Sequence, residues 1–430
     1  MSVTAVLALV AFVAVYALIA TEFVHRVAAA LGGAAAMVLI GAVRGEEMFF
    51  SAETGIDWNV LFLLFGMMVI VGLLRRTGVF EFLAIWAAQR SGARPFRMMV
   101  LLVLVTALAS ALLDNVTTVL LVAPVTLLVC ERLRLDPVPF LLAEAMASNI
   151  GGAATLIGDP PNIIIGSRAG LDFNAFLLHL APIVVLLVAA FVGLCWVLWG
   201  RGLRLDPSRA AVLLKLRGRD AISDPALLRK LGAVLALVLA GFVTHAAHHI
   251  EPSVIALLGA GASVLLARAP AKEYLAEVEW ETLIFFGGLF VMVGALVHQG
   301  LIEELAVGLK TLISGDYLVA SQLILVGSAV LSGLIDNIPY VATMSPLVYE
   351  LVGPAPGLPP GQQSLWWALA LGADLGGNAT AIGASANVVI LGVAARNGHP
   401  ISFWTFTKYG LIVAAVTVAL CVPYLWLRYF

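Results

Sequence analysis

Four aspartates lie inside long stretches of this sequence that otherwise contain almost no charge. Two of them belong to Asp-Asn pairs, Asp114-Asn115 and Asp336-Asn337, and the other two, Asp159 and Asp374, belong to glycine-rich strings. Carboxylate oxygens can bind a proton or a cation, and amide groups can both donate and accept hydrogen bonds. A charged side chain at the centre of a bilayer costs about 2.5–3.5 kcal/mol on insertion scales. Four such residues therefore indicate a transport site rather than helix capping alone.

The glycine-rich strings predict two broken helices. The first runs from Asn149 through Gly158-Asp-Pro-Pro to Asn162, and the second runs from Asp374 through Gly383-Ala-Ser-Ala to Asn387. Glycine and proline interrupt a membrane helix and free backbone groups that need partners. The broken ends offer N–H groups to an anion or an oxyacid and carbonyl groups to a cation.

The predicted site lies at the bilayer midplane, where the Asp-Asn pairs and the two helix breaks converge. The candidate substrate- and ion-binding residues are Asp114, Asn115, Thr117, Thr118, Asn149, Gly151, Gly152, Thr155, Asp159, Asn162, Asp336, Asn337, Asp374, Gly376, Gly377, Asn378, Thr380, Ser385 and Asn387. We predict no metal centre and no cofactor.

The composition is that of a membrane protein. Hydrophobic residues make up 62% of the 430 residues and charged residues only 12%, against about 25% charged in soluble domains. The net charge of −2 gives no reason to expect a nucleic-acid partner. Cys130, Cys195 and Cys421 lie far apart in separate apolar segments, which argues against a disulfide framework, a metal-ligand cluster and a three-thiolate arsenic site.

Span lengths predict an all-α membrane protein of about ten transmembrane helices plus two re-entrant hairpins. A crossing needs about 20 apolar residues, and such segments occur near residues 3–20, 27–43, 58–74, 138–166, 173–200, 231–249, 252–268, 280–297, 365–394 and 402–427. The stretches 98–130 and 317–349 are equal in length and fit neither one crossing nor two. A single helix of that length would be about 50 Å long, and two crossings would need more residues. Because each stretch contains an Asp-Asn pair, we predict hairpins whose tips reach membrane depth.

Charge placement predicts the orientation. With both hairpins returning to the side from which they came, 20 of the 24 lysines and arginines fall on one side and 4 on the other. The basic side of a membrane protein is cytoplasmic. We therefore predict an inner-membrane protein with both termini outside and a cytoplasmic linker over residues 201–230.

The two halves of the chain resemble each other. Trp58–Ala84 aligns without a gap on Trp280–Ala306 at an offset of 222, and the same offset places one Asp-Asn pair on the other. The glycine-rich strings align at an offset of 225. Each half holds five spans and one hairpin, so the second half enters the membrane inverted. The prediction is two inverted repeats, residues 1–200 and 231–430, with the site between them.

Five strings carry a resemblance to a known family: Asp114-Asn-Val-Thr-Thr, Asn149-Ile-Gly-Gly-Ala-Ala-Thr, Gly158-Asp-Pro-Pro-Asn162, Asp336-Asn-Ile-Pro-Tyr340 and Gly383-Ala-Ser-Ala-Asn387. In these strings the sequence resembles the ArsB/NhaD permeases of the ion transporter superfamily, over essentially the whole chain. Members include arsenite and antimonite efflux permeases, Na⁺/H⁺ antiporters and the melanosomal P protein. The resemblance implies an elevator motion and a homodimer.

These observations predict a proton-coupled secondary transporter that exports arsenite or antimonite. A neutral As(OH)₃ would be held by amide, hydroxyl and backbone hydrogen bonds, while titrating carboxylates supply the coupling to protons. Na⁺/H⁺ antiport with the same carboxylates is the first alternative, and transport of an organic or inorganic anion is the second. The chain has no nucleotide-binding motif, so an ATPase subunit would have to be a partner.

A channel and an enzyme are less consistent with the sequence. Inverted repeats around a closed midplane site serve alternating access, and no Ser/His, Cys/His or His/metal constellation appears at membrane depth. Among the four carboxylates, Asp114 and Asp336 occupy equivalent repeat positions, whereas Asp159 and Asp374 lie opposite an alanine and an asparagine. We predict that the first pair is mainly architectural and substrate-binding, and that Asp159 and Asp374 carry most of the proton coupling.

Overall fold

The computed structural model describes residues 2–21, 23–51, 54–92, 94–203, 221–313 and 315–430. Its first half contains α1 (Val3–Ala20), α2 (Arg26–Ile40), α3 (Gly45–Phe50), α4 (Trp58–Arg75), α5 (Val79–Arg90), α6 (Pro95–Leu112), α7 (Asn115–Leu133), α8 (Val138–Gly152), α9 (Pro160–Ala169), α10 (Phe173–His179), α11 (Ala181–Cys195) and the π-helical turn η1 (Trp196–Gly200). Its second half contains α13 (Pro225–His248), α14 (Pro252–Ala267), α15 (Ala271–Leu275), α16 (Trp280–His298), α17 (Leu301–Ile313), α18 (Tyr317–Leu334), α19 (Asn337–Val352), α20 (Pro360–Gly376), α21 (Ser385–Arg396) and α22 (Phe403–Tyr429).

The prediction of an all-α membrane protein is confirmed. Nine of the described helices are long and apolar enough to cross a membrane, and α2, α14 and α21 are shorter apolar helices. Large hydrophobic side chains such as Leu108, Leu323 and Leu427 are exposed on these helices, as expected of surfaces that contact lipid. Of the predicted linker, residues 204–220 lie outside the described residues, and α13 begins at Pro225, within the predicted linker.

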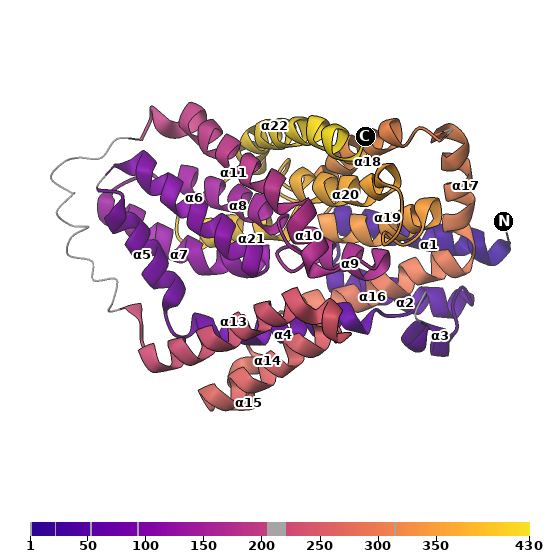
Figure 1. Ribbon diagram of the computed structural model, residues 1–430, viewed down its shortest axis with the longest axis horizontal. Helices are drawn as coiled ribbons and strands as arrows, with labels where there is room; N and C mark the ends of the chain where they lie inside the picture. The colour runs from indigo at the N-terminus through magenta and orange to yellow at the C-terminus, as the bar shows by residue number, and fades with distance from the viewer. Residues whose placement is uncertain (1, 22, 52–53, 93, 204–220, 314) are drawn as a thin grey trace.

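The helices form two bundles, which we name after their central members. The α4–α16 bundle consists of α1, α2, α4, α13, α14 and α16, and the hairpin bundle consists of α6–α9, α11 and α18–α22. In Figure 1, α13, α4 and α14 lie together along the lower edge of the molecule, whereas α11 and α22 lie along the upper edge. Small residues allow the close packing of the first bundle, because Gly66 lies against Ala256 and Gly288 lies against Ala30.

Two hairpins and two interrupted helices meet inside the hairpin bundle. Helix α6 turns into α7 at Leu113 and α18 turns into α19 at Ile335, and both of these residues have extended backbone conformations. Helix α8 ends at Gly152 and α9 begins at Pro160, while α20 ends at Gly376 and α21 begins at Ser385. These interruptions fall inside the glycine-rich strings. The polar residues of the strings are thereby placed at the ends of helices rather than along them.

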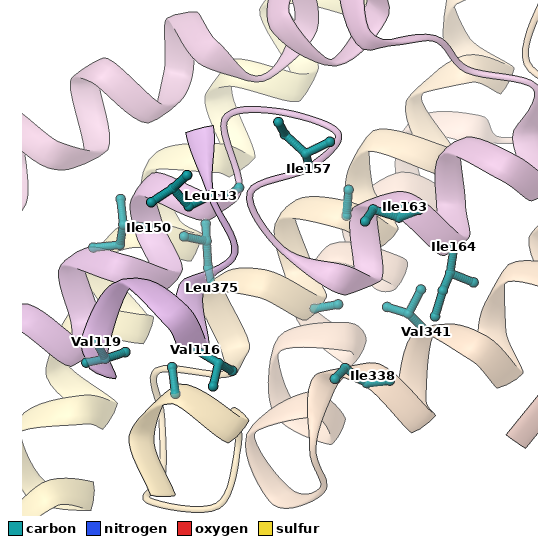
Figure 2. Close-up of a cluster of buried hydrophobic side chains, with 14 of the residues drawn as sticks. Leu113, Val116, Val119, Ile150, Ile157, Ile163, Ile164, Ile338, Val341 and Leu375 are labelled. Atoms are coloured by element: carbon teal, nitrogen blue, oxygen red, sulfur yellow. The ribbon is translucent and has the colours of Figure 1, made fainter. Parts of the chain in front are cut away.

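Apolar side chains pack tightly around these turns and interruptions. Figure 2 shows Leu113 and Val116 beside the first hairpin turn, Ile150 on α8, Ile338 on α19 and Leu375 on α20. All of them belong to one continuous buried cluster. Such packing excludes water from the adjacent polar groups, so those groups must find partners within the protein or in a bound solute.

Candidate functional site

Close backbone contacts fix the two helix interruptions against the hairpins. A Cβ atom added at Gly151 would lie 2.2 Å from the carbonyl oxygen of Ala107 on α6, and one added at Gly376 would lie 2.4 Å from the carbonyl oxygen of Ala329 on α18. Real Cβ atoms do not approach backbone atoms this closely. Only glycine therefore lets α8 and α20 reach the hairpin arms at these points.

In the first interruption, Thr155 and Asn162 stabilise the non-helical backbone. The Thr155 hydroxyl donates to the carbonyl of Ala111 at 2.6 Å, which joins the interruption to α6. The Asn162 amide donates to the carbonyls of Thr155 at 3.1 Å and Gly152 at 3.5 Å. These bonds satisfy carbonyl groups that the helix no longer pairs.

The second interruption contains the corresponding bonds. The Thr380 hydroxyl donates to the carbonyl of Gly333 at 2.6 Å. The Asn387 amide donates to the carbonyls of Gly377 at 2.8 Å and Thr380 at 2.9 Å. Four of the predicted site residues, Thr155, Asn162, Thr380 and Asn387, therefore hold the shape of the interruptions.

A continuous network of buried amides surrounds Asp159. The Asn115 amide donates to the Asp159 carboxylate at 2.9 Å and to the Asn149 side-chain oxygen at 3.1 Å. The Asn337 amide also donates to Asp159, at 3.4 Å to each oxygen. All four residues are at most 2% exposed. The two asparagines that follow the hairpin turns thus converge on one carboxylate.

The network continues across both halves of the chain through Asn149. Its amide donates to the side-chain oxygens of Asn378 at 2.9 Å and Asn387 at 3.1 Å. Both acceptors are fully buried and belong to the second half. Asn149 on α8 therefore joins the two interruptions directly, so the site includes residues from both halves.

Asp374 differs from Asp159 because it lacks hydrogen-bond donors. Its side chain is fully buried, and neither carboxylate oxygen accepts a hydrogen bond from the described residues. Asn162 lies nearby, but its amide is engaged by the Gly152 and Thr155 carbonyls. The described residues also form no salt bridge with Asp374 or Asp159. A buried carboxylate in this state needs a proton or a cation as its partner.

The aspartates of the two Asp-Asn pairs lie outside this network. Asp114 caps its own helix, accepting from the Thr117 backbone N–H at 2.8 Å and from the Thr117 hydroxyl at 2.5 Å. Asp336 accepts from the Ile338 backbone N–H at 3.0 Å and from the Ser385 hydroxyl at 2.7 Å. Both aspartates are partly exposed. Thr118 is buried on the same helix as Thr117, with a hydroxyl that finds no partner among the described residues.

Two cavities lie between the bundles. The first vestibule, of about 840 Å³, is lined by Arg26, Glu279, Asp336, Ser385 and Val388 among others. The second vestibule, of about 310 Å³, includes Asp57, Ile164, Ala342, Ser345 and Tyr349. Each cavity has walls from both bundles. Within the described ranges, no group of three or more His, Cys, Asp or Glu side chains is placed to hold a metal ion.

Sequence reasoning missed Arg26 and Glu279 as residues near the site. Glu279 immediately precedes α16, and its burial raises the pKa of its carboxyl to about 7, with a smaller contribution from the negative charge of Asp114. A hydrogen bond from Thr282 and the charge of Arg26 oppose this rise. Nothing in the local sequence around Arg26 indicates its contact with Ser385 in the other half of the chain.

Comparison with known proteins identifies the family. Residues 16–372 match the family model described as citrate transporter, CitMHS. The chain belongs to this transporter family. It is 57% identical to uncharacterized transporters of Mycobacterium bovis and Mycobacterium tuberculosis, with 99% of each chain covered. It is 37% identical to the human P protein over 95% of this chain and 58% of that protein. The predicted membership of the ion transporter superfamily and the relation to the P protein are confirmed.

A solved transporter shares the fold of this CitMHS-family chain. The crystal structure of the Alcanivorax borkumensis YdaH transporter matches with a TM-score of 0.60 and 14% identity, covering 90% of this chain and 86% of that one. At this identity the likeness concerns the fold alone. The family match and the relatives establish a multi-pass membrane transporter rather than an enzyme. The inner-membrane location and the outward termini stay predictions.

Proposed function

We propose that this chain is a proton-coupled antiporter that exports a small solute from the buried amide network. The observation that supports coupling most strongly is the state of Asp374, which is fully buried and receives no hydrogen bond or salt bridge from the described residues. A proton on this carboxylate removes the penalty of a buried charge, and its loss to one side of the membrane restores the charge. A group that gains a proton on one side and loses it on the other can couple export to a proton gradient.

Trivalent arsenic or antimony hydroxide is the first candidate substrate. The network contains the amides of Asn115, Asn149 and Asn378, and the Asn378 amide nitrogen has no partner among the described residues. Such a site suits a small neutral molecule bearing several hydroxyl groups. No lysine or arginine of the described residues forms a salt bridge with Asp159 or Asp374. A strongly anionic solute would favour a site that contains such cationic side chains. The three cysteines take no part in the network, so recognition would use oxygen and nitrogen atoms rather than thiolates.

Sodium is the second candidate, and the same unpartnered carboxylate favours it. Hard cations prefer oxygen ligands from carboxylates, amides and carbonyls. Two free oxygens of Asp374 lie in a site that also contains asparagine side-chain oxygens, which is a ligand set that Na⁺ accepts. The chain would then exchange Na⁺ for protons at the same carboxylate.

Transport by the purified protein in liposomes would separate these candidates. Vesicles with an imposed pH gradient are assayed for flux of arsenite, antimonite, Na⁺ and citrate, the last as a representative anion. Gradient-driven flux of arsenite or antimonite is the expected result. Flux of Na⁺ alone would establish the second candidate, and flux of citrate alone would contradict both. Asp316→Asn serves as a matched control, because Asp316 caps the distant end of α18.

A further inference from the structure

Arg26 lies in the first vestibule and connects the two bundles. It is the first residue of α2, in the α4–α16 bundle. Its guanidinium donates to the Ser385 hydroxyl at 2.8 Å and lies 3.9 Å from the Asp336 carboxylate, and both of these residues belong to the hairpin bundle. The same guanidinium is positioned over the ring of Phe285 on α16, 5.7 Å from its centroid. Arg26 is thus held by its own bundle while it binds the other one.

The two residues that Arg26 contacts are also bound to each other. The Ser385 hydroxyl donates to Asp336 at 2.7 Å, which joins the turn of the second hairpin to the first residue of α21. The Arg26 side chain is 34% exposed and that of Asp336 is 17% exposed. Because solvent is partly excluded, the attraction between these charges is stronger than between fully exposed ones. Arg26, Asp336 and Ser385 together form what we call the Arg26 cluster.

The second vestibule has corresponding walls and a contact of a different kind between the bundles, because the Ser167 hydroxyl of α9 donates to the carboxylate of Asp57, which precedes α4. The repeat offset of 222 relates Glu279 in the first vestibule to Asp57 in the second, and it also relates Leu120 to Ala342. The two vestibules are therefore lined by equivalent positions of the predicted repeats. They differ in volume, about 840 Å³ against about 310 Å³.

The repeat positions that correspond to Arg26 and Ser385 hold other residues in the opposite half of the chain. Ala30 on α2 packs on Gly288 of α16, and Ala256 on α14 packs on Gly66 of α4. When α2 and α14 are aligned by these two contacts, Pro252 is the counterpart of Arg26. At the offset of the glycine-rich strings, Ser385 corresponds to Pro160. Proline can supply neither the guanidinium nor the hydroxyl. The Asp114 carboxylate, which corresponds to Asp336, is bonded to its own helix instead.

We propose that Arg26 is a positioning residue that sets which vestibule is open when no solute drives the transporter. In a transporter whose two end states have related structures, a contact that exists in only one state shifts the equilibrium toward that state. The Arg26 cluster holds the second hairpin turn and α21 against α2, in an arrangement whose first vestibule has the larger volume. The site can face the other side only after Arg26 separates from Asp336 and Ser385. The inference requires alternating exposure of the site but not a particular solute.

Cysteine labelling tests this inference without any transported substrate. In a background with Cys130, Cys195 and Cys421 replaced by serine, Val388→Cys reports on the first vestibule and Tyr349→Cys on the second. A membrane-impermeant maleimide is applied to each side of reconstituted vesicles. Arg26→Ala should slow labelling at Val388→Cys and accelerate it at Tyr349→Cys, each by at least about threefold. Arg26→Lys, which retains the charge, should keep both rates within about twofold of the parent.

A purely structural role for Arg26 gives a different pattern. General loosening would accelerate labelling at both positions, and an inert residue would leave both rates unchanged; either outcome overturns the proposal. If Arg26→Ala does not fold, Arg26→Gln replaces it, because glutamine retains a donor for Ser385 but removes the charge beside Asp336. The vesicles could show neither arsenite nor Na⁺ flux while Arg26→Ala still shifts the two labelling rates in opposite directions. That result would refute the proposed substrates and leave the role of Arg26 standing.

Discussion

The two hairpin turns carry the same dipeptide and use it differently. Asn115 and Asn337 both donate to Asp159, so the asparagine has one function in both halves. The preceding aspartates diverge, since Asp114 bonds within its own helix whereas Asp336 bonds to Ser385 and lies beside Arg26. The repeated asparagine builds the common site, whereas the aspartates that precede it have different partners in the two halves.

The two helix interruptions show the same division between shared and separate features. Matching threonine and asparagine side chains stabilise both of them. The carboxylates do not match, because Asp159 receives amide hydrogen bonds from both hairpins whereas Asp374 receives none from the described residues. Asp374 therefore depends more strongly than Asp159 on a proton or a cation as its partner, since Asp159 already accepts amide hydrogen bonds.

The largest effect should come from filling the close contacts that both halves share. Gly151→Ala and Gly376→Ala each place a Cβ within 2.4 Å of a backbone carbonyl oxygen. Overpacking of this kind destabilises a protein by about 1–3 kcal/mol, and displacement of α8 or α20 should abolish measurable transport. Thermal unfolding and vesicle flux measure the two effects. Gly261→Ala, which has open space around it, is the control; equal behaviour of all three variants would contradict the packing argument.

A smaller and unequal effect is expected at the two asparagines. Asn115 donates at 2.9 and 3.1 Å, whereas both Asn337 bonds to Asp159 are 3.4 Å long. Loss of a buried hydrogen bond that leaves its partner unsatisfied costs about 1–3 kcal/mol. Asn115→Ala should therefore reduce solute affinity by about tenfold and Asn337→Ala by less. Binding isotherms of the purified variants test this order, with Asn397→Ala as a control outside the network. Greater loss at Asn337 would reverse our assignment.

The smallest effects should separate the two aspartates of the turns. Asparagine is as good a helix cap as aspartate, so Asp114→Asn should change the melting temperature little and leave vestibule labelling unaltered. Asp336→Asn should be similarly stable but should shift labelling toward the second vestibule, because it removes the charge that faces Arg26. We expect a modest loss of solute affinity in both variants. Identical labelling in the two would remove the distinction between the turns.

Much of this architecture could be predicted from local sequence. Apolar length predicted most spans, and the glycine-rich strings marked the places where α8 and α20 end, because glycine weakens the helix at its own position. The partners of each polar side chain could not be predicted in the same way. Asn149 bonds to Asn378, 229 residues away, and Arg26 bonds to Ser385, 359 residues away. Such contacts depend on the packing of the bundles, which residue spacing does not describe.

The assignment of proton coupling to Asp159 and Asp374 is the central claim, and proton-driven exchange in vesicles tests it most directly. The purified Asp159→Asn and Asp374→Asn variants are assayed for downhill solute exchange with and without an imposed pH gradient, beside Asp114→Asn and Asp336→Asn. Both site variants should retain downhill exchange and lose its acceleration by the gradient, with the more complete loss at Asp374. The two turn variants should stay gradient-driven. Gradient-driven transport by Asp374→Asn, with loss of the response in the turn variants, would contradict the account.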